Sequence, residues 1–499
     1  MGDFEENDDT TNATEDNKPK GQKNIKPDEI LDSFKKTLRS IAKVLRNTFT
    51  QPQRAFLVIG LLFGLLMLVL NPPLRVSDEQ IHLFKAYSVS GGHIVSERKD
   101  KGAGSNVPIS FQTTIERVKL IPWSDYRLKL KDISSALKIP LKNSEKFFAD
   151  YRGWAIVTYS PLPYIPQALG IEIGKILNLS PLMLLYLGRL FNLLCWLILI
   201  FLAIRITPVH KWVFFMLALI PRSVNLAASL SADSFTIALC FLVVAYFLRL
   251  AFAKDKQSVE RKDIYILVLF VILLALVKPP SFLLVFLFPL IPIKRFKSKK
   301  EYFAVFAMLV LIAIVITGAW YLIGSRGATT RLPTMSVGKQ LRFLLSHPTR
   351  FLGVTERTIV SSIDMWIAGF IDTLGWIEVN LPSWFVFTYL FLIIAIAAVD
   401  NDDIEIPVKK RAYSLALWLI FFFIFLGIGY LTSTPVGQTS VIEGFQPRYL
   451  IPIAPLLFLI FNNQRVHYEK GKYFYIGIVG FSLLSIALTM YKVVGAYFT

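Results

Sequence analysis

The sequence predicts an all-α integral membrane protein, a bundle of about eleven transmembrane helices. Three observations support this prediction. Of the 499 residues, 54% are hydrophobic and only 18% are charged, against roughly 25% charged residues in soluble domains. The mean hydropathy is +0.52. Apolar runs long enough to cross a hydrocarbon core of about 30 Å recur along the chain, and basic residues cluster between them.

Two segments precede the first apolar run. Residues 1–27 are polar and acidic, without an apolar period, and are predicted to form a disordered tail. In residues 28–49, apolar side chains such as Leu31, Phe34 and Leu38 recur at helical spacing, with lysines and arginines on the other face. This pattern indicates an amphipathic helix on an anionic membrane surface. The groove of a soluble partner protein is the alternative.

A polytopic domain is predicted over residues 54–499. Its first span extends from about residue 55 to 70. Ten more are predicted at about 182–204, 212–228, 232–252, 264–278, 281–293, 303–323, 384–399, 412–430, 449–462 and 474–495. The stretch 161–179 is interrupted by prolines and charged residues, so it is predicted to be an interfacial helix instead.

Basic residues in the short loops orient the bundle. One set of loops carries seventeen lysines and arginines, and the alternate set carries three, Arg222, Lys278 and Arg448. The positive-inside rule makes the first set cytoplasmic. The N-terminus is then cytoplasmic and the C-terminus extracytoplasmic, with the protein in the plasma membrane. The segments 72–160 and 324–383 and the loop 432–448 face outward.

The stretch 71–82, directly after the first span, combines acidic and imidazole side chains. Ser77 and Gln80 form a capping-box pattern, which predicts a helix with Ser77 as its N-cap. Asp78 and Glu79 then lie in the first turn, and His82 lies on the same face as Asp78. This places a carboxylate and an imidazole together at a membrane surface. The alternative is that the two acids simply suit a helix N-terminus.

Several ionisable residues lie near the predicted outer ends of spans. They are Arg189, Arg222, Asp233, Lys278 and Arg448. A charge inside the bilayer costs about 2.5–3.5 kcal/mol on the insertion scale, so such residues usually line a polar cavity or pair with one another. We therefore expect a polar cavity that opens outward. For the longer basic side chains, snorkelling to the headgroups is the alternative.

Other chemistries are excluded by the sequence. The net charge of +19 does not indicate a nucleic-acid partner, because the basic residues lie in short loops between apolar runs. The two cysteines lie inside apolar runs, and the five histidines lack metal-ligand spacing. Phosphate-binding glycine patterns and a nucleophile-elbow serine are also absent from the sequence.

A series of short motifs resembles a bacterial family of multi-pass membrane proteins of unknown function, which is grouped with the GT-C glycosyltransferases. The first motif is Asp78-Glu79-x-x-His82, followed by Lys85-Ala86-Tyr87 and Gly91. The later ones, in the same order as in the family, are Tyr159-Ser-Pro161-Leu-Pro-Tyr164, Gly188-Arg189-Leu190-Phe-Asn192, Ser229-x-Ser231-x-Asp233, Lys278-Pro279, Leu374-Gly375-Trp376 and Gln446-Pro-Arg448-Tyr449-x-x-Pro452. The resemblance covers residues from about 70 to 460.

This resemblance implies a GT-C-like bundle and an inverting glycosyltransferase. Its sugar donor would be carried on a polyprenyl phosphate, and its acceptor would be a cell-surface glycan. Asp78 would be the general base, and Glu79 or His82 would orient it or the acceptor. Arg448, Arg222 and Lys278 would bind the donor phosphate. The residues expected to line the substrate cavity are Tyr159, Asp233, Arg189 and Tyr449.

Two other function classes remain open at this stage. A transporter or flippase for a lipid-linked glycan would use the same cavity without needing a positioned base. A non-catalytic membrane scaffold is the third class. A divalent cation such as Mg²⁺ or Mn²⁺ is compatible with carboxylate and phosphate ligands, but no sequence feature requires one.

Overall fold

The computed structural model describes residues 27–99, 102–118, 127–153, 155–329, 334–376, 378–400, 403–438, 440–466 and 468–498. The predicted tail therefore lies outside the described residues, apart from Pro27. The chain divides into two units, residues 1–50 and 51–499. In the first unit, α1 (Pro27–Phe49) forms where the sequence predicts an amphipathic helix. The exposed Phe34, Leu38 and Leu45 share this helix with exposed basic side chains, and its place on a membrane surface stays a prediction.

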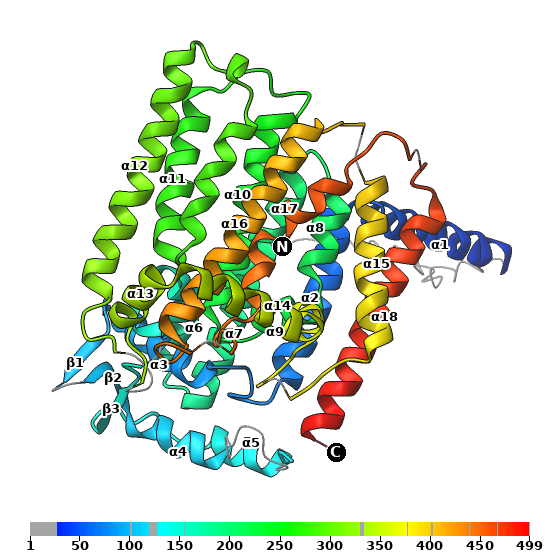
Figure 1. Cartoon of the computed structure of the whole chain (residues 1–499). Coiled ribbons are helices and arrows are strands. Elements are labelled where there is room, and N and C mark those ends of the chain that lie inside the picture. Colours follow the sequence, from blue (N-terminus) through cyan, green and yellow to red (C-terminus); the bar gives the residue numbers. More distant parts are fainter. Residues whose placement is uncertain are drawn as a thin grey trace, which may run out of the picture. The chain divides into compact units, whose positions relative to one another are not determined.

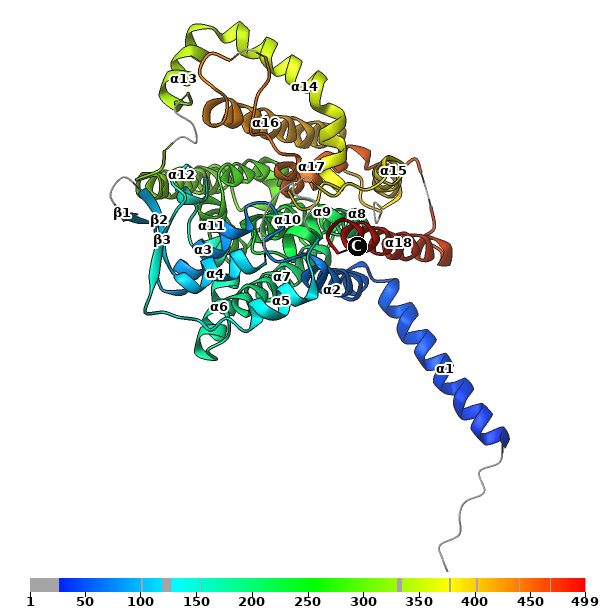
Figure 2. The ribbon, with the colours of Figure 1, turned by 90° about the horizontal axis from the view of Figure 1, so that it is seen from below.

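In the described part of the second unit, six helices are long and apolar enough to cross a membrane. They are α2 (Pro52–Leu70), α7 (Pro181–Ile206), α10 (Ala232–Phe252), α12 (Lys299–Gly324), α16 (Val408–Thr432) and α18 (Lys472–Tyr497). Each coincides with a predicted span to within a few residues. The most buried is α10, with 83% of its apolar window inside the protein against 17% for α12. Figure 2 shows α10 between α7 on one side and α16 and α17 on the other.

The other five predicted spans take shorter forms, so the count of eleven is not confirmed. Two are 17-residue helices, α11 (Arg261–Val277) and α15 (Ser383–Val399). The span at 212–228 divides into α8 (Lys211–Ala218) and α9 (Pro221–Ala227). The span at 281–293 is the 3₁₀ helix η3 (Ser281–Leu290), followed by η4 (Ile293–Arg295). The span at 449–462 divides into η5 (Pro447–Ile453), α17 (Ala454–Phe458) and η6 (Leu459–Phe461).

Proline explains three of these differences. Pro221 begins α9, Pro289 lies inside η3 and Pro452 lies inside η5. A proline inside an α-helix removes a backbone hydrogen bond and clashes with the preceding turn, which costs about 3 kcal/mol. Because apolar residues continue across these prolines, each interrupted segment is predicted from the sequence as one span.

The segment 72–160 contains strands that the sequence analysis did not predict. Its elements are α3 (Glu79–Ser90), β1 (Glu97–Lys99), β2 (Gly102–Pro108), α4 (Ile109–Arg117), α5 (Leu130–Leu137), β3 (Lys146–Asp150) and η1 (Ala155–Thr158). The strands form one antiparallel sheet in the order β1-β2-β3, with Gly104 opposite Asp150. The next elements are η2 (Leu162–Tyr164) and α6 (Ile165–Ile176). At 12 residues, α6 is too short to cross a bilayer.

Two further helices, α13 (Val337–Ser346) and α14 (Pro348–Ile371), fill most of the second predicted outer segment, 324–383. A loop from Asp372 to Leu381 connects α14 to α15. Within this loop, Gly375 has a positive φ of 61°, a conformation that glycine adopts without steric cost. The loop contacts the turn that follows α2, because Ser77 Oγ donates a hydrogen bond to the Gly375 carbonyl at 2.6 Å.

Helix α18 ends on the same side of the bundle as α2. Leu128 N donates to the Tyr497 carbonyl at 2.8 Å, and Arg127 Nη1 donates to the Gly495 carbonyl at 2.7 Å. These bonds satisfy carbonyl groups that a helix C-terminus leaves unpaired. The end of α18 and the segment that follows α2 therefore share one side, called the site side below, opposite to the side where α2 begins (Figure 1).

The orientation of this bundle can be tested with reporters. With the site side facing outward, a reporter fused after Thr499 is expected to be extracytoplasmic, and one inserted near Lys299 is expected to be cytoplasmic. Phosphatase and fluorescent-protein fusions measure this directly. A cytoplasmic reporter after Thr499 would contradict the predicted orientation.

Candidate functional site

The candidate site begins at a turn that follows α2. Leu74 and Asp78 adopt the left-handed conformation, with φ values of 66° and 63°. Such values are uncommon outside glycine, and they persist only where the surroundings hold them. Asp78 is the N-cap of α3 but makes no side-chain cap, and the helix starts at Glu79. The predicted Ser77 cap is therefore wrong, because the Ser77 hydroxyl bonds the loop at Gly375 instead.

Glu79 and Arg189 form a fully buried ion pair below this turn. Arg189 Nη2 and Nε lie 2.6 and 2.7 Å from the two Glu79 carboxylate oxygens. Glu79 also accepts a hydrogen bond from Leu230 N, at 3.2 Å. The remaining Arg189 donors bond the carbonyls of Leu68, Asn71 and Pro72 at the end of α2. These contacts occupy both side chains within the protein and anchor α3 and α7 to the end of α2.

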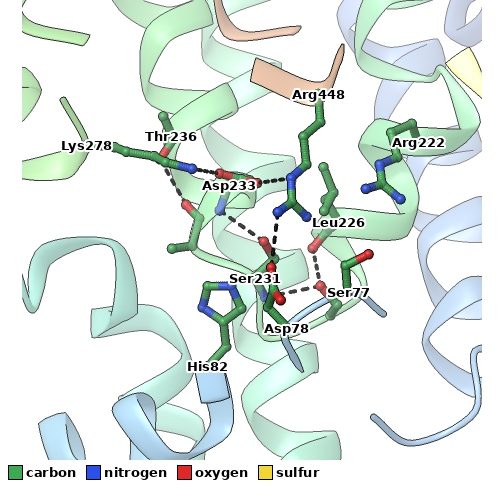
Figure 3. Close-up of polar contacts among 12 residues, drawn as sticks. Ser77, Asp78, His82, Arg222, Leu226, Ser231, Asp233, Thr236, Lys278 and Arg448 are labelled. Atoms are coloured by element: carbon green, nitrogen blue, oxygen red, sulfur yellow. Dashed lines mark hydrogen bonds and ion pairs between the residues drawn. The ribbon is translucent and has the colours of Figure 1, made fainter. Parts of the chain in front are cut away.

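Four charged residues meet on the site side and are called the charge cluster below: Asp78, Asp233, Lys278 and Arg448 (Figure 3). Lys278 Nζ lies 2.6 Å from Asp233 Oδ1. Arg448 bridges the two carboxylates, with Nε 3.2 Å from Asp233 Oδ2 and Nη2 3.2 Å from Asp78 Oδ2. The structure thus brings together residues that lie up to 370 positions apart in the chain.

The ends of separate elements hold these side chains in place. Asp233 lies in the first turn of α10, where Ser231 Oγ accepts a hydrogen bond from Asp233 N. A helix N-terminus favours a negative charge by about 0.3–1 kcal/mol. Lys278 is the extended residue that ends α11, and Arg448 lies in η5. The cluster therefore lies at the ends of apolar helices and not at their centres.

Aromatic rings cover Lys278. Its ammonium group lies 5.2 Å from the ring centroid of Tyr159 and 4.8 Å from that of Tyr449, within the range of cation–π contacts. The predicted cavity residues Tyr159, Tyr449 and Asp233 thus belong to one site. A pocket of about 20 Å³ beside them is also lined by Phe421 and Phe425 of α16, which the sequence analysis missed. This volume holds about one water molecule, so a sugar enters only if these walls move apart.

Arg222 on α9 lies across from Arg448 (Figure 3). It is buried, and one of its nitrogens donates to the Thr373 carbonyl. Arg222 Nε and Arg448 Nη1 are among the buried side-chain atoms of the described residues that have no hydrogen-bond partner. Buried donors are nearly always satisfied in folded proteins. Guanidinium groups bind carboxylates and phosphates most strongly, so this pair of open donors suits an anion.

Asp372 is a buried carboxylate near Arg222 that the sequence analysis missed. Burial raises the pKa of Asp372 to about 6 against the opposing effect of hydrogen bonds and of Arg222. Its Oδ2 accepts a hydrogen bond from Leu381 N at 3.0 Å, which ties the two ends of the 372–381 loop together. The adjacent Thr373 is the residue whose carbonyl receives Arg222. Asp372 therefore shapes the loop whose Thr373 carbonyl binds Arg222.

His82 on α3 is held by a third tyrosine, Tyr164, which was not predicted as a site residue from the sequence. His82 Nδ1 lies 2.8 Å from the Tyr164 hydroxyl. Burial lowers the pKa of His82 to about 4, although Asp78 and Asp233 oppose this shift, so the imidazole is neutral at pH 7. In the described structure Tyr164 makes no other hydrogen bond through its hydroxyl. This contact holds the imidazole ring through Nδ1.

The lowered pKa of His82 makes a prediction for stability. The unfolded chain binds a proton on His82 below pH 6.5, whereas the folded protein binds one only near pH 4. The neutral His82 therefore contributes fully to the free energy of unfolding above pH 6.5. This contribution is lost as the pH falls from 6.5 to about 4. A pKa difference from 6.5 to about 4 corresponds to about 3 kcal/mol in the free energy of unfolding. The loss of thermal stability between pH 7 and pH 4.5 should thus be smaller in His82→Asn than in the wild type. The matched control is the exposed His93→Asn, and equal losses in both variants would contradict the prediction.

The family described as "Predicted membrane protein (DUF2142)" matches residues 61–457. The chain belongs to this family. The matched residues include all four members of the charge cluster and Arg222. No curated protein and no solved structure matches the chain. Membership in this family supports a membrane protein with several apolar helices, and the chemistry of the site has to be argued from its own residues.

The donor set of the site does not fit a divalent cation. Both carboxylates of the charge cluster are already paired, Asp233 with Lys278 and Arg448, and Asp78 with Arg448. Within the described ranges, no group of three or more His, Cys, Asp or Glu side chains could hold a metal ion. A hard cation such as Mg²⁺ needs several oxygen ligands that are not neutralised by ammonium or guanidinium groups. The two carboxylates therefore act as partners of the cations and not as metal ligands.

Proposed function

We propose that the protein is an inverting glycosyltransferase that takes a sugar from a polyprenyl-phosphate donor. The observation that carries this proposal is the bridge of Arg448 between Asp78 and Asp233, next to the open guanidinium donors of Arg222 and Arg448. A carboxylate for proton transfer and cations for a leaving phosphate thus lie side by side. They lie at the ends of apolar helices, where the phosphate of a membrane lipid would also be found.

Phosphate recognition would fall to the two arginines. Arg448 Nη1 and Arg222 Nε are buried and open, and a phosphate oxygen between them would satisfy both. Lys278 is less available, because its ammonium is only 2.6 Å from Asp233 and is covered by two tyrosine rings. We therefore assign Lys278 to holding Asp233 and Tyr449 in place, close to the phosphate but not as its main ligand.

The reaction would be a single displacement at the anomeric carbon. The acceptor hydroxyl oxygen bonds to this carbon while its proton passes to the Asp78 carboxylate. The bond between the anomeric carbon and the phosphate oxygen breaks, and its electron pair stays on the phosphate. Arg448 and Arg222 stabilise the charge that develops there. Attack from the face opposite the leaving group inverts the anomeric centre.

Donor binding would also release the base. The Arg448–Asp78 distance of 3.2 Å is longer than the 2.7–2.9 Å typical of charge-assisted hydrogen bonds, whereas Lys278–Asp233 is short at 2.6 Å. Arg448 is thus held less tightly than Lys278, since its contact with Asp233 is also 3.2 Å long. A phosphate that draws Arg448 toward itself would free the Asp78 oxygen to accept the acceptor proton. His82, a neutral imidazole held through Nδ1, would orient the acceptor or Asp78 through Nε2.

We place this reaction on the outer face of the plasma membrane, with a cell-surface glycan as the acceptor and no nucleic-acid partner. The test is sugar transfer by protein purified into lipid nanodiscs, with radiolabelled sugars on polyprenyl phosphates and a surface glycan extract as the acceptor. Label in the glycan supports the proposal. Donor movement across liposome membranes without transfer would instead support a transporter or flippase. If neither transfer nor movement is observed, a non-catalytic scaffold is supported.

Arg448→Ala should weaken donor binding. Loss of a hydrogen bond to a charged group costs about 1.5–3 kcal/mol, or roughly 10- to 100-fold in the donor dissociation constant. Turnover at saturating donor should also fall, because the leaving phosphate loses a cation. Titration with a fluorescent polyprenyl-phosphate sugar measures binding, with the exposed Arg326→Ala as the matched control. Unchanged binding in folded Arg448→Ala protein would remove Arg448 from the phosphate site.

A further inference from the structure

Two loops lie together at the end of the bundle opposite to the site side. Residues 253–260 connect α10 to α11, and residues 296–298 connect η4 to α12 (Figure 1). Val259 N donates a hydrogen bond to the Arg295 carbonyl at 2.7 Å. The Arg295 guanidinium also donates to two carbonyls at the end of α10. These bonds join the two loops into one surface, on the side predicted to be cytoplasmic.

This surface gathers exposed cations. Six of them form no ion pair among the described residues and are called the basic patch below: Lys254, Arg261, Lys294, Lys297, Lys299 and Lys300. The acids in ion pairs beside them are Asp255, Glu260 and Asp263, whose partners are Arg249, Lys256 and Lys262. In this described surface Glu301 has no ion pair, and its carboxylate accepts the backbone N–H of Lys297 at 2.8 Å. Six cations thus stand against one such acid.

The other loops on this side do not concentrate free cations in this way. Lys410 and Arg411 donate to backbone carbonyls within the protein. Lys470 Nζ lies 2.7 Å from Asp400 Oδ1. The exposed cations that remain here are divided among the start of α2 and three separate loops: Arg54, Arg205, Lys409, Arg465 and Lys472. A general excess of basic loops on one side therefore does not account for the density of the basic patch.

The basic patch lies beside a surface that faces lipid. Only 17% of the apolar window of α12 is buried in the protein, and Phe303, one turn after Lys299, is 58% exposed. On the neighbouring α11, Tyr265 is 71% exposed, one turn after Arg261. Exposed tyrosines of this kind are enriched at the level of lipid headgroups. The cations therefore lie at headgroup height, next to the tails that cover α12.

We propose that the basic patch binds the headgroup of an anionic phospholipid whose tails lie along α12. Clusters of about four to eight lysines and arginines at the end of a membrane helix are typical of such sites. A phospholipid supplies both parts that this surface needs, an anionic headgroup for the cations and apolar tails for the exposed side of α12. A nucleic acid or an acidic protein would match the charge alone. The inference does not depend on sugar transfer at the charge cluster.

The test removes four charges from the basic patch in the variant Lys294→Gln/Lys297→Gln/Lys299→Gln/Lys300→Gln. The matched control removes four exposed charges from other loops on the same side, Arg205→Gln/Lys409→Gln/Arg465→Gln/Lys472→Gln. Native mass spectrometry counts the phospholipids that each protein retains from micelles with equal dioleoyl phosphatidylglycerol and phosphatidylcholine. The wild type and the control should retain several-fold more phosphatidylglycerol, whereas the patch variant should retain both lipids about equally.

A version with arginine at the same four positions of the patch should keep the preference, because it keeps the charge. An equal preference for phosphatidylglycerol in the patch variant and the wild type would overturn the proposal, as would a wild type without a preference. Loss of the preference in the arginine version would attribute it to local packing and would also overturn the proposal. If the patch variant loses binding of a labelled oligonucleotide while its lipid preference is unchanged, the partner is a nucleic acid and the proposal fails.

Discussion

Asp78→Asn is expected to lower the turnover of sugar transfer by roughly 100-fold or more while donor binding stays near normal. Asparagine keeps the size of the side chain and tolerates the left-handed conformation that Asp78 adopts. It lacks the charge and the basic lone pair that would accept the acceptor proton. The contact with Arg448 also weakens, so Arg448 remains available for the phosphate.

The assay for this variant must separate chemistry from folding. Turnover and the donor dissociation constant are measured on monodisperse protein, normalised to the folded amount. The matched control is Asp364→Asn on α14, where the carboxylate is exposed and lies outside the charge cluster. If folded Asp78→Asn retains near-normal turnover, the base is a different group, and Asp233 and Glu79 are the next candidates.

The spans with uninterrupted apolar sequence were predicted closely from the sequence. Predicted residues 232–252 coincide with α10, and predicted residues 182–204 fall within α7. Apolar length is sufficient for such helices, because each backbone group is satisfied within its own helix. The strands β1–β3 were missed for the opposite reason. Their sequences are short and polar, as in Gly102–Pro108. The pairing of β2 with β3 joins residues far apart in the chain, with Gly104 opposite Asp150 and Pro108 opposite Lys146.

The sequence predicted which charged residues belong to the site, but not which of them form ion pairs with one another. A charge near the end of a span needs a partner, which is why Asp233, Lys278 and Arg448 could be singled out. Which carboxylate receives which cation depends on how α10, α11 and η5 pack, and no local pattern encodes this. The Ser77 prediction was wrong because a left-handed Asp78 moves the helix start by one residue. Tyr164 belongs to one of the sequence motifs, but its contact with His82 is visible only in the folded structure.

Glu79→Gln is expected to destabilise the protein by about 3–5 kcal/mol, because it leaves the Arg189 guanidinium buried without a counter-charge. Both side chains are fully buried, so neither water nor salt can replace the lost partner. Arg189 also holds three carbonyls at the end of α2. The turn that carries Asp78 should therefore loosen together with the ion pair. The apparent unfolding temperature and the yield of monodisperse protein measure the loss.

The matched control is Glu172→Gln, which breaks a pair of the same length, 2.6 Å, between Glu172 and Lys175. This pair is partly exposed on one helix, so its removal should cost less than about 1 kcal/mol. The comparison also separates two roles for Glu79. In a purely anchoring role, the Glu79→Gln molecules that fold at low temperature should transfer sugar at close to the wild-type rate. Normal stability with a large loss of turnover would instead make Glu79 a catalytic group beside Asp78, because an amide can keep the hydrogen bond from Leu230 but cannot take up a proton.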